Sequence, residues 1–292
     1  MKIKHLLCFI ALCLFFTPGK AQQLSVMTLR NGATVYIWED KSKPDVFGMI
    51  AFKVGSVDDP EQYTGLAHYL EHVMFKGTQT IDALDWEKEK PIYEKIIAKY
   101  DERAALSDPA AREAVDKEIN DLTREAAQYA AGNEFSLLVD HMGGQGLNAS
   151  TGYDQTEYHN SFPPSQLEKW LEIYSERLID PVFRGFQTEL EAVYEEYNMY
   201  NDDRGSRMRE FIYEQAFGDH PYARPIIGLP EHLKNPQLSK LIDFYNTWYG
   251  PQNMSIILVG NIDAKEAIPM IRDKFERVPR RAEIHREKKP VR

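Results

Sequence analysis

Cysteine is almost missing from this sequence of 292 residues. The only two, Cys8 and Cys13, lie near the N-terminus inside a short apolar run. Residues 22–292 can therefore form no disulfide, and they offer no thiolate to a metal ion. Any metal held by this part of the chain must be bound by histidine, aspartate or glutamate.

The sequence also lacks an apolar run long enough to cross a bilayer, which takes about 20 residues. The longest run, Leu6–Phe16, follows two lysines and precedes small residues that end at Ala21. This pattern predicts a signal peptide over residues 1–21 and a periplasmic or secreted protein without a stable membrane anchor. A retained anchor and a lipid on Cys13 are the alternatives, although Leu12 stands where a lipoprotein has a small residue.

Basic residues are fewer than acidic ones, 35 against 45. Removal of the signal peptide takes away three lysines and no acidic residue, which leaves 32 against 45 and a formal charge of −13. Such a charge argues against nucleic acid as a partner and is compatible with basic or mixed peptides.

The stretch 68–72 reads His-Tyr-Leu-Glu-His and holds three groups that suit a zinc hydrolase. If it is helical, His68 and His72 are four residues apart and project from one face, with Glu71 at its border. Two imidazoles at this spacing can take two corners of a tetrahedral zinc site, and the carboxylate can accept a proton from a metal-activated water.

The flanking residues favour a helix, because Thr64 is a candidate N-cap and Gly77 is a stop signal. The order H-x-x-E-H is the signature of inverzincins. The same pattern also fits an amphipathic helix whose histidines are only hydrogen-bonded. A zinc site needs a third protein ligand from elsewhere in the chain.

The acidic stretch 188–197 is the best source of that ligand. Glu189 and Glu196 are seven residues apart, so they share one face of a helix. An inward-facing carboxylate needs a partner, either a metal or an arginine such as Arg177. The residues alone leave four candidates open: Glu189, Glu191, Glu195 and Glu196.

The hydrophobic pattern predicts an α+β domain, a mainly antiparallel sheet covered by helices. Residues 24–40 favour a β-hairpin that turns at Asn31-Gly32, and 46–54 a third strand. Residues 81–132 are rich in charge and predict two antiparallel helices inserted into the domain, with a break at 107–109. We assign 22–276 to the domain and 277–292 to a charged linker or a truncated end.

The stretch LAHYLEHVMFKGT (66–78), together with ELEAVYEEYNM, resembles the M16 family of zinc metallopeptidases. That family pairs H-x-x-E-H with a distal E-x-x-[AV]-[VI]-x-x-E, which this chain matches at 189–196. The resemblance implies a two-layer M16-type domain and one Zn²⁺ held by His68, His72 and Glu196. It implies that Glu189 orients a ligand histidine. The interval from His72 to Glu196 exceeds the family's commoner spacing by about the length of the helical insert.

The resemblance further implies a zinc endopeptidase in which Glu71 is the general base. Asn148, Ala149 and Thr151 match the family's edge strand and would bind a peptide substrate, although Asn148 fits a turn equally well. Family members close a chamber from paired domains, so a second M16-type domain or subunit is expected. The alternative is a non-catalytic partner subunit, or a half that is inactive alone.

Overall fold

The structure is a computed structural model that describes residues 23–281, 283, 284 and 286. The signal peptide predicted over residues 1–21 lies outside this part, as do residues 287–292 of the predicted linker. In the described part of the chain, no helix combines the length and the apolar character that crossing a membrane requires.

A six-stranded sheet lies at the centre of the fold, in the order β1-β2-β6-β3-β5-β4. Its strands are β1 Gln23–Thr28, β2 Thr34–Glu39, β3 Val46–Phe52, β4 Gln145–Thr151, β5 Thr156–Phe162 and β6 Met254–Gly260. Every neighbouring pair is antiparallel except β2 and β6. The predicted α+β class with a mainly antiparallel sheet is therefore confirmed.

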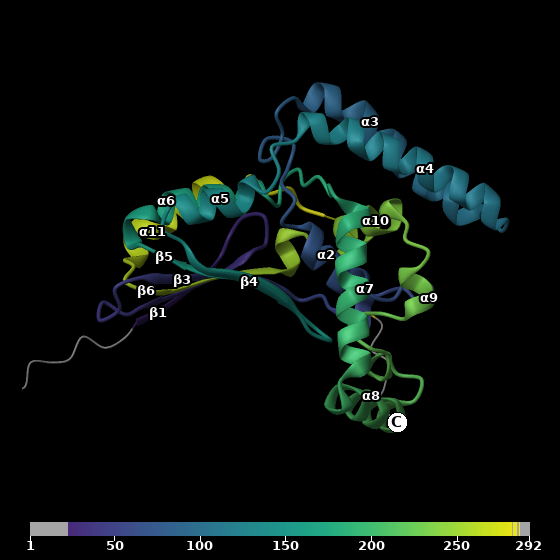
Figure 1. The fold of residues 1–292 in the computed structure, drawn as a ribbon. Coiled ribbons are helices and arrows are strands. Elements are labelled where there is room, and N and C mark those ends of the chain that lie inside the picture. Colours follow the sequence, from purple (N-terminus) through teal and green to yellow (C-terminus); the bar gives the residue numbers. More distant parts are fainter. Residues whose placement is uncertain (1–22, 282, 285, 287–292) are drawn as a thin grey trace, which may run out of the picture.

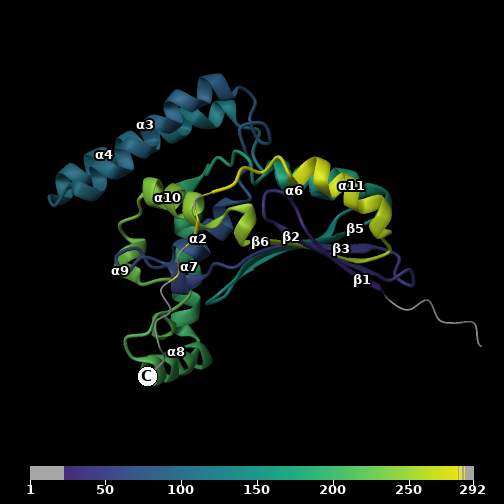
Figure 2. The ribbon, with the colours of Figure 1, turned by 180° about the vertical axis from the view of Figure 1, so that it is seen from behind.

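One face of the sheet packs against helices, because side chains along β3, β5 and β6 alternate between buried and half-buried. The helices α5 Glu134–His141, α6 Leu167–Glu176 and α11 Ala264–Phe275 cover this face (Figures 1 and 2). Trp170 of α6 is fully buried and donates to the side chain of Asn160 on β5 at 2.8 Å. The two views show no helix on the opposite face within the described residues.

A second group of helices gathers beside the sheet (Figure 1). It comprises α2 Leu66–Val73, α7 Phe186–Asp202, α8 Arg204–Phe217, α9 Pro230–Leu233 and α10 Leu238–Trp248. α2 lies within this group, in contact with α7, α10 and the edge strand β4. The short helix α9 begins with a proline in its first turn.

The charged insert forms two antiparallel helices, α3 Trp86–Ala105 and α4 Pro109–Ala126, which project away from the sheet (Figure 1). Asp108 caps α4 by accepting from the backbone N–H of Ala111 at 3.1 Å, and Pro109 occupies the first helical position. The predicted break between the helices is therefore correct.

Candidate metal centre

Helix α2, which carries His68, Glu71 and His72, has its N-cap at Gly65 and not at the predicted Thr64. Gly65 has φ +89°, and a Cβ at this position would lie 2.5 Å from the carbonyl oxygen of Ile227. Only glycine fits such a turn. The hydroxyl of Thr64 accepts instead from the backbone N–H of Leu229 at 2.9 Å.

Two histidines from α2 meet one glutamate from α7. Nε2 of His68 lies 3.6 Å from Oε2 of Glu196, and Nε2 of His72 lies 3.5 Å from the same oxygen. Zinc–ligand bonds of about 2.0–2.2 Å give ligand–ligand distances of about 3.4 Å along a tetrahedral edge. Both observed distances are close to that value, and the three ligand atoms all lie within 4.8 Å of one another, so the donor set is compatible with a tetrahedral cation.

His68 is suited to donate a lone pair. Burial, reinforced by the neighbouring His72, lowers the pKa of its imidazole to about 4, so the ring is neutral at pH 7. Its Nδ1 is buried and has no hydrogen-bond partner in the described part of the chain.

His72 lies in a more acidic environment. Burial opposes its charge, but interactions with Glu189 and Glu196 prevail and raise its pKa to about 9. Nδ1 of His72 faces Oε2 of Glu189 at 3.6 Å, and Lys76 forms an ion pair with the same carboxylate. Glu189 thus faces the ring nitrogen of His72 that does not face Glu196.

The structure separates the four glutamates that the sequence left open. Glu189 and Glu196 face α2, whereas Glu191 and Glu195 are exposed. Arg177 forms no ion pair with any of them among the described residues; it donates to the backbone carbonyl of Met74 at 3.0 Å.

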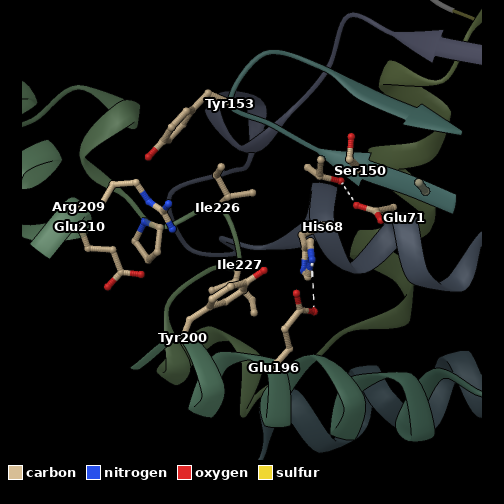
Figure 3. A pocket seen from close by; sticks show the side chains of 13 residues that line it. His68, Glu71, Ser150, Tyr153, Glu196, Tyr200, Arg209, Glu210, Ile226 and Ile227 are labelled. Carbon is tan, nitrogen blue, oxygen red and sulfur yellow. Dashed lines mark hydrogen bonds and ion pairs between the residues drawn. The ribbon is translucent and has the colours of Figure 1, made fainter. Parts of the chain in front are cut away.

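Glu71 points toward the edge strand β4, where the hydroxyl of Thr151 donates to its Oε2 (Figure 3). Burial raises the pKa of Glu71, and the bond from Thr151 opposes this shift. The sequence analysis assigned Thr151 to the substrate and missed this contact. No local signal could have revealed it, because 80 residues separate the two partners.

A pocket of about 270 Å³ opens at the centre (Figure 3). Ala149 and Thr151 line it, as expected, but Asn148 does not. Asn148 pairs with His159 inside the sheet, so a turn at this position is wrong. The sequence analysis missed these lining residues: Ser150, Tyr153, Tyr200, Arg209, Glu210, Pro225, Ile226 and Ile227.

Helical spacing could have identified Tyr200, which follows Glu196 by one turn of α7. Ser150 could have been inferred from its place between Ala149 and Thr151, whereas the other missed residues have no such local signal, because tertiary packing brings them to the pocket. Tyr153, for example, stacks on Tyr213 of α8 with ring centroids 5.4 Å apart. This contact joins the β4–β5 turn to α8 on the far side of the pocket from the metal centre.

Comparison with known proteins gives a consistent result. Residues 34–90 and 121–229 match the family described as Insulinase (Peptidase family M16), and residues 237–292 match the Peptidase M16 inactive domain. Residues 91–120, which separate the two segments matched by the Insulinase model, lie in the α3–α4 hairpin.

Two relatives are named as zinc proteases. Probable zinc protease PqqL of Escherichia coli (strain K12) is 25% identical over 270 residues, which cover 88% of this chain and 23% of the relative. Zinc protease PqqE of Helicobacter pylori is 24% identical over 254 residues, which cover 86% of this chain and 46% of the relative. The chain thus spans less than half the length of these two curated relatives.

A solved structure shares the fold. The first half of the periplasmic protease PqqL from Escherichia coli has a TM-score of 0.70 and 24% identity, covering 93% of this chain and 50% of that chain.

Proposed function

The chain belongs to peptidase family M16, and on that premise we propose that it is a zinc-dependent endopeptidase domain that hydrolyses peptides or unfolded polypeptides. One observation carries the proposal. Three candidate ligand side chains converge within 4.8 Å of one another, and two of them, His68 and Glu196, line with Glu71 a pocket that an edge strand also lines. A helix whose histidines were only hydrogen-bonded would not require this convergence.

One Zn²⁺ would be held by His68, His72 and Glu196, with Glu189 orienting the ring of His72. The donor set of two imidazole nitrogens and one carboxylate is one that catalytic zinc commonly uses. When bound there, zinc would polarise a peptide carbonyl and lower the pKa of a water molecule.

Glu71 would be the general base. Its raised pKa brings the carboxylate closer to the range in which it can accept a proton from water and later deliver it to the departing amine. Thr151 would fix the carboxylate through its hydrogen bond, so that Glu71 presents one orientation to the pocket.

The edge strand β4 would bind the substrate as an added strand. Among the described strands β4 pairs only with β5, so its other edge offers backbone donors and acceptors to an extended peptide. Ala149 and Thr151 would lie beside the scissile bond, and Asn148 would contact residues further along the peptide. A backbone-based mode of this kind suits unfolded substrates of varied sequence.

The proposal includes a partner and a compartment. A second M16-type domain or subunit would complete the pocket. In support, this chain covers only 50% of the solved first half of PqqL, and 23% and 46% of the curated relatives PqqL and PqqE. The signal peptide over residues 1–21 would direct the protein to the periplasm or outside the cell. We further propose a domain over 22–276, with residues 81–132 inserted and a charged linker after it.

The test is the variant Glu71→Gln, assayed for zinc content and for digestion of a peptide library, alone and with a second M16-type domain supplied in trans. We expect zinc content to stay at the parent level and chelator-sensitive cleavage to fall at least about hundredfold. The matched control is Glu157→Gln, a half-buried carboxylate on β5 bonded to Ser150. Cleavage by Glu71→Gln at the parent rate would refute the mechanism.

The alternative is a non-catalytic M16 partner subunit. It is supported by the observation that this chain covers less than half the length of PqqL and PqqE. It predicts that the parent binds zinc but shows no chelator-sensitive cleavage even when the second domain is supplied.

A further inference from the structure

Helix α2 is fixed at both ends by buried side chains that the proposed chemistry does not use. At its start, Oδ2 of Asp59 accepts from the backbone N–H of Gly65 at 2.7 Å, and Oδ1 accepts from that of Ala67 at 2.9 Å. The first N–H groups of a helix have no partner within it, and Gly65 has no side chain to cap them. Asp59, only 5% exposed, supplies both acceptors from six residues upstream.

At the end of α2, Nη2 of Arg177 donates to the carbonyl oxygen of Met74 at 3.0 Å. Arg177 is 2% exposed and forms no ion pair with a carboxylate in the described part of the chain. Its guanidinium lies 4.3 Å from the ring centre of Phe135, 4.5 Å from that of Tyr158 and 4.9 Å from that of Phe75. Aromatic faces and a helix C-terminus are the surroundings that stabilise a buried cation.

α2 has only eight residues, too few to be stable as an isolated helix. The directions of His68 and His72 therefore depend on how the ends of the helix are held. We propose that Asp59 and Arg177 are positioning residues that fix the two ends of α2 and so preorganise both histidines for the metal. This inference rests on the proposed function only in requiring that the centre binds zinc.

The competing explanation is a purely structural role, in which these residues stabilise the whole domain without affecting the metal centre. The two explanations differ in the zinc affinity of the folded protein. A structural role lowers the unfolding temperature and leaves the affinity unchanged, whereas a positioning role weakens the affinity even where folding is intact.

The experiment measures zinc dissociation constants of the whole chain by competition with a chromophoric chelator, after circular dichroism has established folding. We expect Asp59→Ala and Arg177→Met to weaken binding about tenfold or more, the range found for residues that orient metal ligands. Asp59→Asn should weaken it less, because the amide oxygen still accepts one N–H. This milder variant keeps the test decisive if the alanine variant does not fold.

Asn31→Ala is the matched control. Asn31 is a buried polar side chain that donates to the carbonyls of Phe275 and Val278 at 2.7 and 3.1 Å, in the turn beside the opposite edge strand, β1. It should lower the unfolding temperature without changing the zinc affinity. An equal loss of affinity in this control would overturn the inference, because general destabilisation would then explain the effect.

Hydrogen exchange of residues 64–76 in metal-free protein gives a second readout. We expect exchange in this segment to accelerate in Asp59→Ala and Arg177→Met and to stay at the parent rate in Asn31→Ala. Parent-like affinity and exchange in both variants would refute the positioning role while leaving the proposed function intact. A parent protein that binds no zinc would refute the proposed function, and exchange alone would then decide whether the ends of α2 are held in this way.

Discussion

The metal helix α2 and the projecting hairpin α3–α4 are both helical, but their stability comes from different sources. α2 has eight residues, six of them buried, and its ends are bonded to Asp59 and Arg177. The hairpin helices have 20 and 18 residues, few of them buried, and their caps are supplied by adjacent residues. The metal centre therefore depends on distant parts of the chain, whereas the hairpin depends mainly on its own sequence.

This difference predicts that a substitution in the hairpin will not change the zinc affinity, and that a substitution at the metal centre will not destabilise the hairpin. Four changes test the separation, beginning with the one that should have the largest effect.

Glu196→Ala should reduce zinc affinity about a thousandfold, or ~4 kcal/mol, because it removes one of only three protein ligands. Isothermal titration with zinc measures this loss. Glu195→Ala is the control, since the neighbouring side chain is exposed on the same helix. If both variants bind zinc equally well, Glu196 is not a ligand.

Ile119→Ala in α4 should destabilise the hairpin by about 2–4 kcal/mol, because a side chain that is 2% exposed leaves a cavity. Hydrogen exchange of α3 and α4 measures this change, and the zinc affinity should stay within about twofold of the parent. A large loss of affinity would show that the hairpin and the metal centre are coupled.

Asp59, at the start of α2, should give the stability of the protein a pH dependence. Burial raises the pKa of Asp59 to about 7, against the opposing bonds from Ala67 and Gly65 and the nearby charge of Arg224; Asp58 adds to the increase. The folded protein thus keeps a proton that the unfolded chain releases near pH 4. Stability should therefore fall as pH rises from about 4 to 7, by up to about 1.4 kcal/mol per pH unit.

Denaturant unfolding across this pH range measures the slope. Asp59→Asn should flatten it. A slope that persists in Asp59→Asn would assign the effect to another group.

Glu118→Gln should have the smallest effect, less than about 0.5 kcal/mol, because the ion pair of Glu118 with Lys99 lies at the surface and is screened by salt. Thermal unfolding at low and high salt measures it. A loss above about 1 kcal/mol would show that surface charge contributes more to the hairpin than its buried residues suggest.

The same contrast explains how much could be predicted from the sequence. The helical hairpin followed from local signals, the high charge of residues 81–132 and the break at 107–109. The hairpin of the first two strands followed from the Asn31-Gly32 turn. His68, Glu71 and His72 also came from local spacing, and they fall on one helix as expected. The pairing of Glu196 with them required the resemblance to a known family.

What was missed depends on contacts between distant segments. The choice of Gly65 over Thr64 as the start of α2 is set by the backbone of Ile227, about 160 residues away. Thr151 reaches Glu71 only because β4 forms the edge of the sheet, and Arg177 reaches Met74 only because α6 packs on the same core. Propensity and spacing carry no information on such contacts.

The edge strand β4 lines the pocket, and its chain direction would also set the direction in which a peptide binds there. The strand runs from Gln145 toward the metal centre and ends at Thr151, beside Glu71. A peptide paired antiparallel to it would run the opposite way. Residues on the carboxyl side of the cleaved bond would then lie along β4, and those on the amino side would extend past Thr151 toward Tyr153 and α8. The direction of β4 would thus decide which residues of a substrate are bound by backbone pairing and which are bound by side-chain contacts.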